Sequence, residues 1–341
     1  MTPTPNPRSD PTWFPIGFDL KADTLTFLKT DRQTLSEAAF LDQRFYPAAP
    51  QTQAIKLSTA LQETVQTAPI NWIFHTAFCC STLMARALDI PGKSLALKEP
   101  DILMQLTNTR RMVAQTGTTE TTLAALEGLV LNLLGRRFSP DETILIKPTN
   151  PANPLIDLAL KRGETCLFMV SSLEDFLISV IKKGEPCRSF VRTLYNIFAL
   201  DPASLSQIPQ RQALAFTDLQ IAALVWHHQI QHMTASAQRG GSNIRAMDGN
   251  KLPIEPAPYL TAATSLFGLG WTENDVTTQA TGSVFQKNSK FDDQSYDASI
   301  RASEAENIRE TYAEAIDVTL KWAANVNLGG TVKMLPAQSL L

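Results

Sequence analysis

Cysteine and charge are both scarce in this sequence of 341 residues. Four cysteines are too few for a disulfide scaffold, and Cys79 and Cys80 are neighbours that do not normally pair with each other, so a reducing compartment fits this usage. Charged residues make up 18% of the chain, the formal net charge is -3, and no block of five or six like charges occurs. The charge pattern therefore indicates no nucleic-acid partner.

Long apolar runs are also missing. The longest apolar stretch, Ala213–Trp226, is interrupted by Asp218 and Gln220 and is shorter than the ~20 residues that cross a bilayer, so we expect no membrane partner. Met1–Pro15 is rich in Pro and Thr and has neither the charged start nor the apolar run of a secretory signal. We interpret it as a loosely ordered arm and expect a cytoplasmic protein.

Short runs of Ile, Val, Phe and Leu alternate with longer segments of helical period, a pattern typical of a parallel sheet covered by helices. The predicted strands are Asn71–Thr76, Ser94–Glu99, Glu142–Lys147, Thr165–Ser171 and Asn243–Asp248. The predicted helices are Thr52–Thr67, Thr82–Leu88, Pro100–Leu106, Thr119–Leu134, Pro154–Lys161, Leu173–Ile181, Arg188–Ala199, Arg211–Gln238, Pro256–Phe267 and Ala302–Ala324. No repeat or sharp change of composition divides the chain, which indicates one domain with helical insertions.

Polar residues end or follow four of these strands. Ligands of open α/β sheets bind at the carboxyl ends of the strands. The residues at those ends are His75, Lys98, Glu99, Lys147 and Ser171, and we expect the chemistry of the protein among them.

The segment after the first strand has the order strand, tight turn and helix, with the helix beginning at Ser81 and Thr82. Such a helix start directs free N–H groups and the positive end of the helix dipole at the edge of the sheet, which together with two hydroxyls suits an anion. The alternative is that Ser81 is only a helix cap.

Two motifs close to this loop are similar to phosphate-binding motifs but lack part of the required pattern. Gly92-Lys93-Ser94 is similar to the end of a Walker A motif, but the earlier glycine position is Ala87 and a strand follows, which predicts a turn. Cys80 and Arg86 have the spacing of a cysteine phosphatase loop, yet the segment between them lacks glycine and is predicted to be helical. An inert, buried cysteine pair is the alternative.

Ala77–Met84 resembles a motif of the sulfotransferase family, P-loop-like proteins that bind 3′-phosphoadenylyl sulfate. The phosphosulfate loop of that family reads Pro-(Lys/Arg)-Ser-Gly-(Ser/Thr)-Thr-(Leu/Trp)-Leu. Ser81, Thr82 and the helix match, whereas Phe78 and Cys80 stand in place of the basic residue and the glycine. In the family the basic residue reaches the bridging oxygen as charge develops, which a phenyl ring does not do.

Two later segments extend the resemblance. Ser171–Ser179 is similar to the family's 3′-phosphate segment, Arg-Asn-Pro-x-Asp-x-x-x-Ser, with Asp175 and Ser179 kept and Ser171 in place of the arginine. The segments similar to the family's Tyr-Glu-Asp-Leu, Asp-Pro-Glu and Phe-Leu-Gly-Leu are Met247–Gly249, Glu255–Pro256 and Leu266–Leu269. The matches follow one another in the family's order.

The resemblance implies an α/β fold of three layers, P-loop NTPase-like, with a central parallel sheet flanked by helices and with helical insertions. It implies an N-terminal arm and cover segment over 1–48, a sulfotransferase-like domain over 49–330 and a C-terminal tail over 331–341. The implied function is transfer of a sulfuryl group from 3′-phosphoadenylyl sulfate to a hydroxyl or amine of a small-molecule acceptor, with no metal.

Sulfuryl transfer, like phosphoryl transfer, needs positioning, charge stabilisation and a base for the acceptor. Family members with a carboxylate base place a Glu near the second strand, so the resemblance implies Glu99 as the base; the alternative is a Glu that only interacts with a helix dipole. His75 is the alternative base, unless it is a hydrogen-bonded histidine at a strand end. Lys147 is predicted to supply the positive charge missing at position 78, unless it is a solvated strand end.

The donor is expected to contact the loop, the 3′-phosphate segment and a basic C-terminal segment. The predicted donor-binding residues are Cys79, Cys80, Ser81, Thr82, Ser171, Ser179, Lys287 and Lys290. Lys182 and Lys183, with Arg188 and Arg192, offer a further anion-binding wall. The alternative for all these charges is a solvated surface.

Two other functions remain open. A P-loop kinase needs an Asp at the end of an apolar strand to hold magnesium, which these strand ends lack. A degenerate fold that only binds a nucleotide or a protein is favoured by the missing basic residues.

His228 and His232 have the i, i+4 spacing of a metal pair but no identifiable third ligand, so we predict no metal. The sequence carries no signal for the oligomeric state.

Overall fold

Five parallel strands form the centre of the molecule. The computed structural model describes residues 6–62, 69–201, 210–286, 298–326 and 339–341. The strands of the central sheet are, in spatial order, β5 (Ser94–Lys98), β6 (Thr143–Lys147), β4 (Ile70–His75), β7 (Cys166–Val170) and β8 (Ile244–Asp248). Each neighbouring pair is parallel, and β4, the first of these five strands along the chain, lies in the middle.

The strands form where the sequence has short apolar runs, because both faces of the sheet are covered. Alternate residues of each strand belong to two separate cores: Trp72 and Phe74 of β4 pack on one side, and Ile73 packs on the other. All five predicted strands are confirmed to within one residue at each end.

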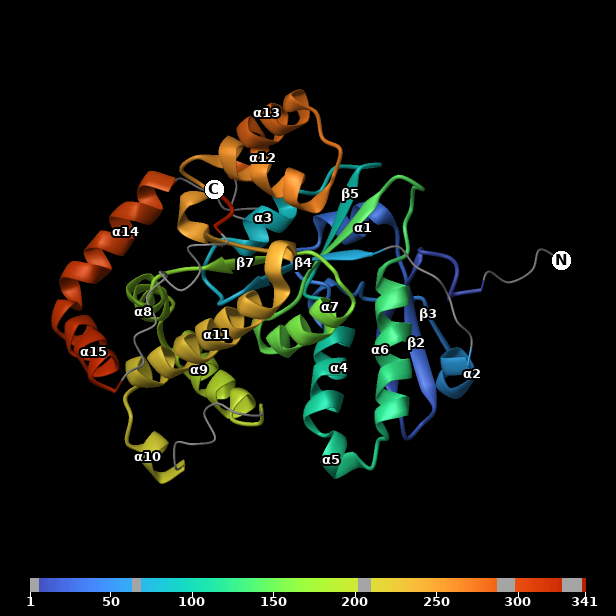
Figure 1. Ribbon diagram of the computed structural model, residues 1–341, viewed down its shortest axis with the longest axis horizontal. Coiled ribbons are helices and arrows are strands. Elements are labelled where there is room, and N and C mark those ends of the chain that lie inside the picture. Colours follow the sequence, from blue (N-terminus) through green and yellow to red (C-terminus); the bar gives the residue numbers. More distant parts are fainter. Residues whose placement is uncertain (1–5, 63–68, 202–209, 287–297, 327–338) are drawn as a thin grey trace.

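Helices cover both faces of the sheet (Figure 1). One face packs against α3 (Ser81–Ala87) and α12 (Pro256–Phe267), with α13 (Glu273–Thr281) beside them. The helices of the other side are α4 (Asp101–Arg111), α5 (Val113–Thr116), α6 (Glu120–Leu134), α7 (Ile156–Lys161), α8 (Leu173–Lys182), α9 (Gly184–Phe198), α10 (Gln210–Leu214), α11 (Asp218–Gly240), α14 (Ala298–Thr311) and α15 (Ala313–Asn325). This arrangement confirms the predicted fold class, a three-layer α/β fold with helical insertions.

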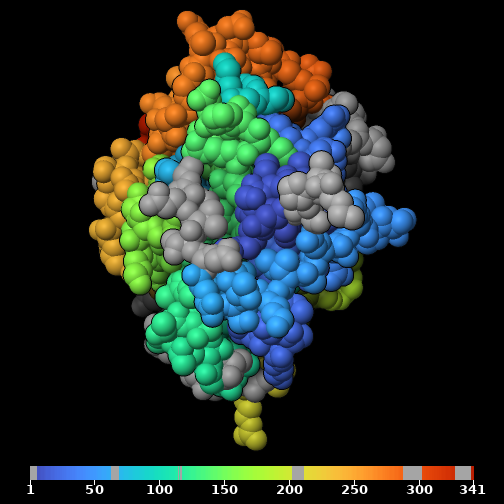
Figure 2. Space-filling model, turned by 90° about the vertical axis from the view of Figure 1, so that its right-hand side faces the viewer, coloured from blue at the N-terminus to red at the C-terminus, as the bar shows by residue number. Residues whose placement is uncertain are grey.

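A second, antiparallel sheet covers part of the helical layer. It consists of β1 (Trp13–Asp19), β2 (Thr24–Lys29) and β3 (Thr52–Lys56) and packs on α4 and α6. Figure 2 shows the blue N-terminal residues spread over this side of the molecule, and the yellow α10 projects from the lower end in Figures 1 and 2. The sheet joins residues on both sides of position 48.

Two N-terminal predictions were wrong. The arm Met1–Pro15 contains the beginning of β1, and the predicted helix Thr52–Thr67 is instead β3 followed by α2 (Leu57–Gln62), with 63–67 outside the described residues. The side chains of β3 alternate between exposed and half-buried as in a strand with one covered face. This segment is a strand because it pairs with β2, which lies more than twenty residues earlier in the chain.

Two predicted helices each contain a break. The predicted helix Arg211–Gln238 is α10 and α11, because the Thr217 and Gln220 side chains form a capping box that starts α11. The predicted helix Ala302–Ala324 is α14 and α15, interrupted at Tyr312. Helix α13 was not predicted. No helix within the described residues is long and apolar enough to cross a membrane.

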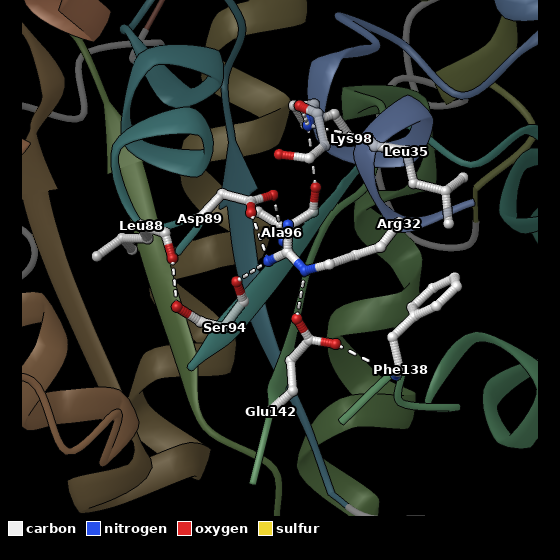
Figure 3. A network of polar contacts seen from close by, with 10 residues as sticks. Arg32, Leu35, Leu88, Asp89, Ser94, Ala96, Lys98, Phe138 and Glu142 are labelled. Atoms are coloured by element: carbon white, nitrogen blue, oxygen red, sulfur yellow. Dashed lines mark hydrogen bonds and ion pairs between the residues drawn. The ribbon is translucent and has the colours of Figure 1, made fainter. Parts of the chain in front are cut away.

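An ionic network joins the N-terminal segment to the edge of the central sheet (Figure 3). Arg32, the first residue of α1 (Arg32–Glu37), donates to the carboxylates of Glu142 (2.6 Å) and Asp89 (2.8 Å) and to the carbonyl of Ser94 (2.8 Å). Both carboxylates are nearly inaccessible to solvent, so the guanidinium neutralises charges that would be costly to leave unpaired. The network holds α1 against β5.

Lys98 continues this attachment from β5. Its ammonium is completely buried and donates to the carbonyls of Leu35 and Ser36 at the end of α1, and of Ala96 in its own strand. Burial lowers the pKa of Lys98 to about 8, an effect that the carboxylate of Asp89 only partly offsets. Lys98 is therefore a structural cation directed away from the carboxyl edge of the sheet.

Candidate active site

The loop between β4 and α3 has an unusual backbone for residues with side chains. Ala77, Phe78 and Cys80 have φ angles of 72°, 56° and 57°, in the left-handed region that glycine adopts most readily. Each such residue costs about 1–3 kcal/mol and persists only where the surroundings enforce it. The loop lies at the carboxyl end of the central strand, which is where ligands of open α/β sheets bind.

His75 is one of the residues that hold this loop. Its Nδ1 accepts a hydrogen bond from the Ala77 N–H at 3.0 Å, so Nε2 carries the proton and donates to the Pro148 carbonyl at 3.0 Å. Both ring nitrogens are thus engaged with the backbone, and the side chain is buried. This geometry gives His75 a positioning role in the loop and leaves no ring nitrogen ready to take a proton.

Cys79 attaches the loop to β7 and to the turn after β8. Its thiol donates to the Met169 carbonyl at 3.2 Å, and burial raises the pKa of this thiol to about 11. The carbonyl of Cys79 packs against Gly249, where a β-carbon would come within 1.8 Å of the carbonyl oxygen. Only glycine fits at position 249, and Cys79 contributes backbone and packing here, not a reactive thiolate.

Two buried amides support the same loop. Asn153 donates to the His75 carbonyl at 3.1 Å, and Gln229 of α11 donates to the Thr76 carbonyl at 3.3 Å. The Gln229 side-chain oxygen in turn accepts from Asn150 at 3.1 Å. These amides bind carbonyls at the end of β4 and the start of the loop, and they fix the loop relative to the helical layer.

Glu99 and Lys147 meet at the carboxyl ends of β5 and β6. Lys98 and Lys147 are register partners, so the next residue, Glu99, lies beside Lys147, and their side chains form an ion pair. The Glu99 side chain is 17% exposed and that of Lys147 only 1%. Glu99 also has a left-handed φ of 55°, and its N–H donates to the Lys147 carbonyl at 2.7 Å. Lys147 is therefore the inner member of the pair and orients the reachable carboxylate.

The predicted donor-binding serines and threonine lie on three segments: the start of α3, the end of β7 and α8. Ser81 and Thr82 begin α3 and are buried. Ser171 follows β7 and is completely buried; among the described residues its hydroxyl has no hydrogen-bond partner, while its carbonyl accepts from Trp226 at 3.0 Å. Ser179 is half-buried on α8. Lys287 and Lys290 lie outside the described residues.

Phe78, which stands where the resemblance calls for a basic residue, packs on α8. Its ring lies 5.3 Å from that of Phe176, centroid to centroid, and the Lys183 ammonium lies 4.7 Å from the Phe78 ring centroid. The sequence suggested Lys183 only as one of several cations of an anion-binding wall. Two others, Arg188 and Arg192, are paired with Asp218.

Two predictions about short motifs are confirmed: Gly92-Lys93 forms a turn before Ser94, and the segment between Cys80 and Arg86 is helical. Lys93 precedes β5 in a turn and pairs with Asp275 at 2.5 Å. Arg86 lies inside α3, and Cys80 is its N-cap residue. The residues between Cys80 and Arg86 are thus helical and do not wrap around a phosphate as a phosphatase loop does.

His228 belongs to a buried ionic cluster with Asp201 and Arg111. Its Nε2 lies 3.5 Å from a carboxylate oxygen of Asp201, which Arg111 also contacts at 2.6 Å. Burial alone would raise the pKa of Asp201, but the hydrogen bonds from His228 and Arg111 outweigh it and hold this pKa below its usual value. Burial lowers the pKa of His232. Within the described residues no three His, Cys, Asp or Glu side chains are grouped to hold a metal.

Comparison with known proteins adds a distant likeness. No protein-family model and no curated protein matches the chain. A solved structure described as "Sulfotransferase Domain from the Curacin Biosynthetic Pathway" is similar to 73% of this chain over 98% of its own length, with 11% sequence identity and a TM-score of 0.41. Its name is that of the family whose motifs the sequence resembles.

Proposed function

We propose that this protein is an enzyme that transfers a sulfuryl group from 3′-phosphoadenylyl sulfate to a hydroxyl or amine of a small-molecule acceptor. The observation that carries the proposal is the loop at the end of the central strand, in which Ala77, Phe78 and Cys80 have left-handed φ angles. Glu99 and Lys147 lie at the ends of the two strands beyond it.

The groups at the loop suit the anionic part of such a donor. The first intrahelical bond of α3 runs from the Met84 N–H to the Cys80 carbonyl, so the N–H groups of Ser81 and Thr82 precede it and have no partner within the helix. The left-handed φ angles of Ala77, Phe78 and Cys80 are of the kind found in anion-binding nests, where successive backbone N–H groups converge. The Ser81 and Thr82 hydroxyls add donors of the same kind.

The 3′-phosphate segment contributes the second set of donors. The Ser171 hydroxyl is buried without a partner in the described part of the chain, and an unsatisfied buried hydroxyl costs about 1–3 kcal/mol. A phosphate oxygen would relieve that cost once the residues covering Ser171 move aside. Ser179, two turns further along the chain, is the other hydroxyl that we assign to this end of the donor.

Glu99 is the group we assign as the base. Its carboxylate is the reachable half of the ion pair, and Lys147 behind it fixes the orientation of that carboxylate. When bound, the donor supplies an activated sulfuryl group. Glu99 takes the acceptor proton as the acceptor oxygen or nitrogen bonds to sulfur, and the sulfur–oxygen bond to the nucleotide breaks, which releases 3′-phosphoadenosine 5′-phosphate.

The helical insertions are where we place the acceptor pocket. Helices α5, α6, α10 and α11 belong to these insertions, and all four lie on the side of the sheet opposite α3. A small molecule is the acceptor class that we propose. The four cysteines are all free, which supports a reducing, cytoplasmic location.

A transfer assay tests the proposed function. The full chain is incubated with radiolabelled 3′-phosphoadenylyl sulfate and a mixture of phenols, alcohols and amines, and the label is followed by chromatography. We expect label on an acceptor and stoichiometric release of 3′-phosphoadenosine 5′-phosphate. Tight binding of that nucleotide with no transfer to any acceptor would instead support a binding protein without catalysis.

A further inference from the structure

An arginine of the N-terminal segment lies near the reachable carboxylate of Glu99. The Leu41 N–H donates to the Lys98 carbonyl at 2.7 Å, and the Asp101 N–H donates to the Leu41 carbonyl at 3.1 Å. The chain around Leu41 is therefore attached to β5 on both sides of Glu99. Arg44 follows three residues later, and its side chain is 61% exposed to solvent.

Electrostatics also indicate that this guanidinium is close to Glu99. Hydrogen bonds to Asp42 raise the pKa of Arg44, the charges of Asp42 and Glu99 raise it further, and burial opposes these effects. Coulomb attraction weakens with distance, so a contribution from Glu99 indicates that the carboxylate and the guanidinium lie near each other. Lys147 pairs with Glu99 but is almost completely buried. A molecule that approaches Glu99 can therefore reach Arg44, whereas it cannot reach Lys147.

The Arg44 side chain is already ordered by two neighbours. Its Nε donates to both carboxylate oxygens of Asp42 at 2.9 Å, and the guanidinium lies over the Phe40 ring, 3.9 Å from the ring centroid. Nη2 also donates to Asp42, whereas Nη1 has no hydrogen-bond partner within the described residues. An ordered guanidinium loses little side-chain entropy when it binds a ligand, and its remaining N–H donors suit a carboxylate.

We propose that Arg44 binds a carboxylate of the acceptor, so that the acceptor class of this protein is a small acid that also carries the reacting hydroxyl or amine. The inference rests on the proposed function and adds the substrate class to it. Without a cation in reach, Glu99 would repel an acidic acceptor, and the charge of Arg44 offsets that repulsion. The acceptor then lies between the two residues, with its carboxylate at Arg44 and its hydroxyl or amine at Glu99.

The test compares acids with their neutral esters as acceptors. The acids are glycolate, 3-hydroxybutyrate, 4-hydroxybenzoate and β-alanine, and each is compared with its methyl ester. Initial rates with labelled 3′-phosphoadenylyl sulfate give kcat/KM for each compound. We expect the wild type to use at least one acid about tenfold or more better than its ester, as for a hydrogen bond between charged groups. Arg44→Gln is expected to lose this preference, and Arg44→Lys, which keeps the charge, to retain part of it.

Arg239→Gln is the matched control. The Arg239 side chain is 58% exposed and is paired with one aspartate, Asp157 at 2.6 Å, much as Arg44 is paired with Asp42. Arg239 lies at the end of α11, shortly before β8 begins, and so at the edge of the sheet opposite to Glu99. We expect this variant to keep the wild-type preference for acids. Circular dichroism and calorimetry with 3′-phosphoadenosine 5′-phosphate verify that each variant folds and binds the nucleotide.

The outcomes separate this inference from the function it rests on. Esters that react as well as their acids in the wild type, or a wild type that binds the nucleotide and sulfates none of the acids, overturn the acidic acceptor alone. A preference for acids that persists in folded Arg44→Gln overturns the role of Arg44, and so does an equal loss in Arg239→Gln. A wild type that does not bind the nucleotide overturns both proposals.

Discussion

Lys147 lies behind Glu99 at the carboxyl edge of the central sheet, and the two side chains form an ion pair in which only the carboxylate is reachable from solvent. The pairing follows from the parallel register of β5 and β6, which sets Lys98 opposite Lys147 and so brings the next residue to the Lys147 side chain. A reachable carboxylate with a fixed orientation is suited to accepting a proton.

The Glu99–Lys147 pair predicts two different losses of activity. Glu99→Gln keeps the shape but removes the proton acceptor, so we expect turnover to fall about 10²–10⁴-fold with nucleotide affinity unchanged. Lys147→Met leaves the carboxylate without its orienting partner, and we expect a smaller loss of turnover, again with affinity kept. Single-turnover rates and calorimetry measure both quantities.

Glu120→Gln, on an exposed helix start of α6, is the control for this pair and is expected to behave as the wild type. Normal turnover in Glu99→Gln, together with an inactive but folded His75→Gln, would contradict the assignment of the base. The engaged ring nitrogens of His75 make us expect His75→Gln to reduce stability instead.

Gly249→Ala tests whether the loop is held by close packing. The added β-carbon would meet the Cys79 carbonyl oxygen at 1.8 Å, so the loop or the turn after β8 must shift. We expect the free energy of unfolding to fall by about 1–3 kcal/mol, as for overpacked cores, and nucleotide affinity to fall with it. Urea denaturation and calorimetry give the two values.

Gly128→Ala is the matched control, because the residue is inside α6 and, apart from its chain neighbours and the nearby backbone of α6, no described atom lies within 4 Å of a β-carbon there. That variant is expected to gain roughly 0.5–1 kcal/mol of stability, since alanine favours a helix over glycine. Equal stability of the two variants would show that the loop is not clamped at position 249.

Lys98 predicts a particular dependence of stability on pH. Its pKa is about 8 in the folded protein against an ordinary value of 10.5, so between these values the unfolded chain binds more protons at this site than the folded one. The contribution of Lys98 to the free energy of unfolding therefore rises as the pH increases from about 8 to about 10.5.

The measurement compares wild type with Lys98→Met, because other titrations cancel in the difference. We expect the free energy of unfolding of the wild type to increase, relative to that of the variant, by up to about 3 kcal/mol across that pH range. A difference in unfolding free energy that stays constant from pH 7 to pH 10.5 would show that the folded pKa of Lys98 is not lowered. Nucleotide affinity is not expected to change, since this ammonium faces α1.

The central sheet was predictable because its strands are local patterns. Each buried parallel strand is a short apolar run bounded by turns, and no partner strand is needed to recognise it. β3 is an alternating strand of five residues that runs directly into a helix, so its identity depends on pairing with the distant β2, and the sequence favoured helix over the whole segment. The break before α11 depends on a capping box at Thr217, a signal that was present and missed.

In the candidate site, too, the residues at strand ends were predictable, whereas the contacts between distant segments were not. Glu99 and Lys147 were predicted as strand-end residues, but their ion pair depends on register between two strands that are more than forty residues apart. The left-handed angles of Ala77, Phe78 and Cys80 have no sequence signal, since glycine is the residue that usually marks such positions. The contact of Lys183 with Phe78 is a tertiary contact that no spacing indicates.

Binding of 3′-phosphoadenosine 5′-phosphate in magnesium-free buffer is the most direct test of the proposed site. Near-saturation, at about 100 times the dissociation constant, stabilises a protein by roughly 2.7 kcal/mol, and a large domain shifts by about 2–4 °C per kcal/mol. We therefore expect the melting temperature to rise by several degrees with this nucleotide, and not with ATP and magnesium. No shift with 3′-phosphoadenosine 5′-phosphate beside a clear shift with magnesium-ATP would contradict the account and indicate a kinase.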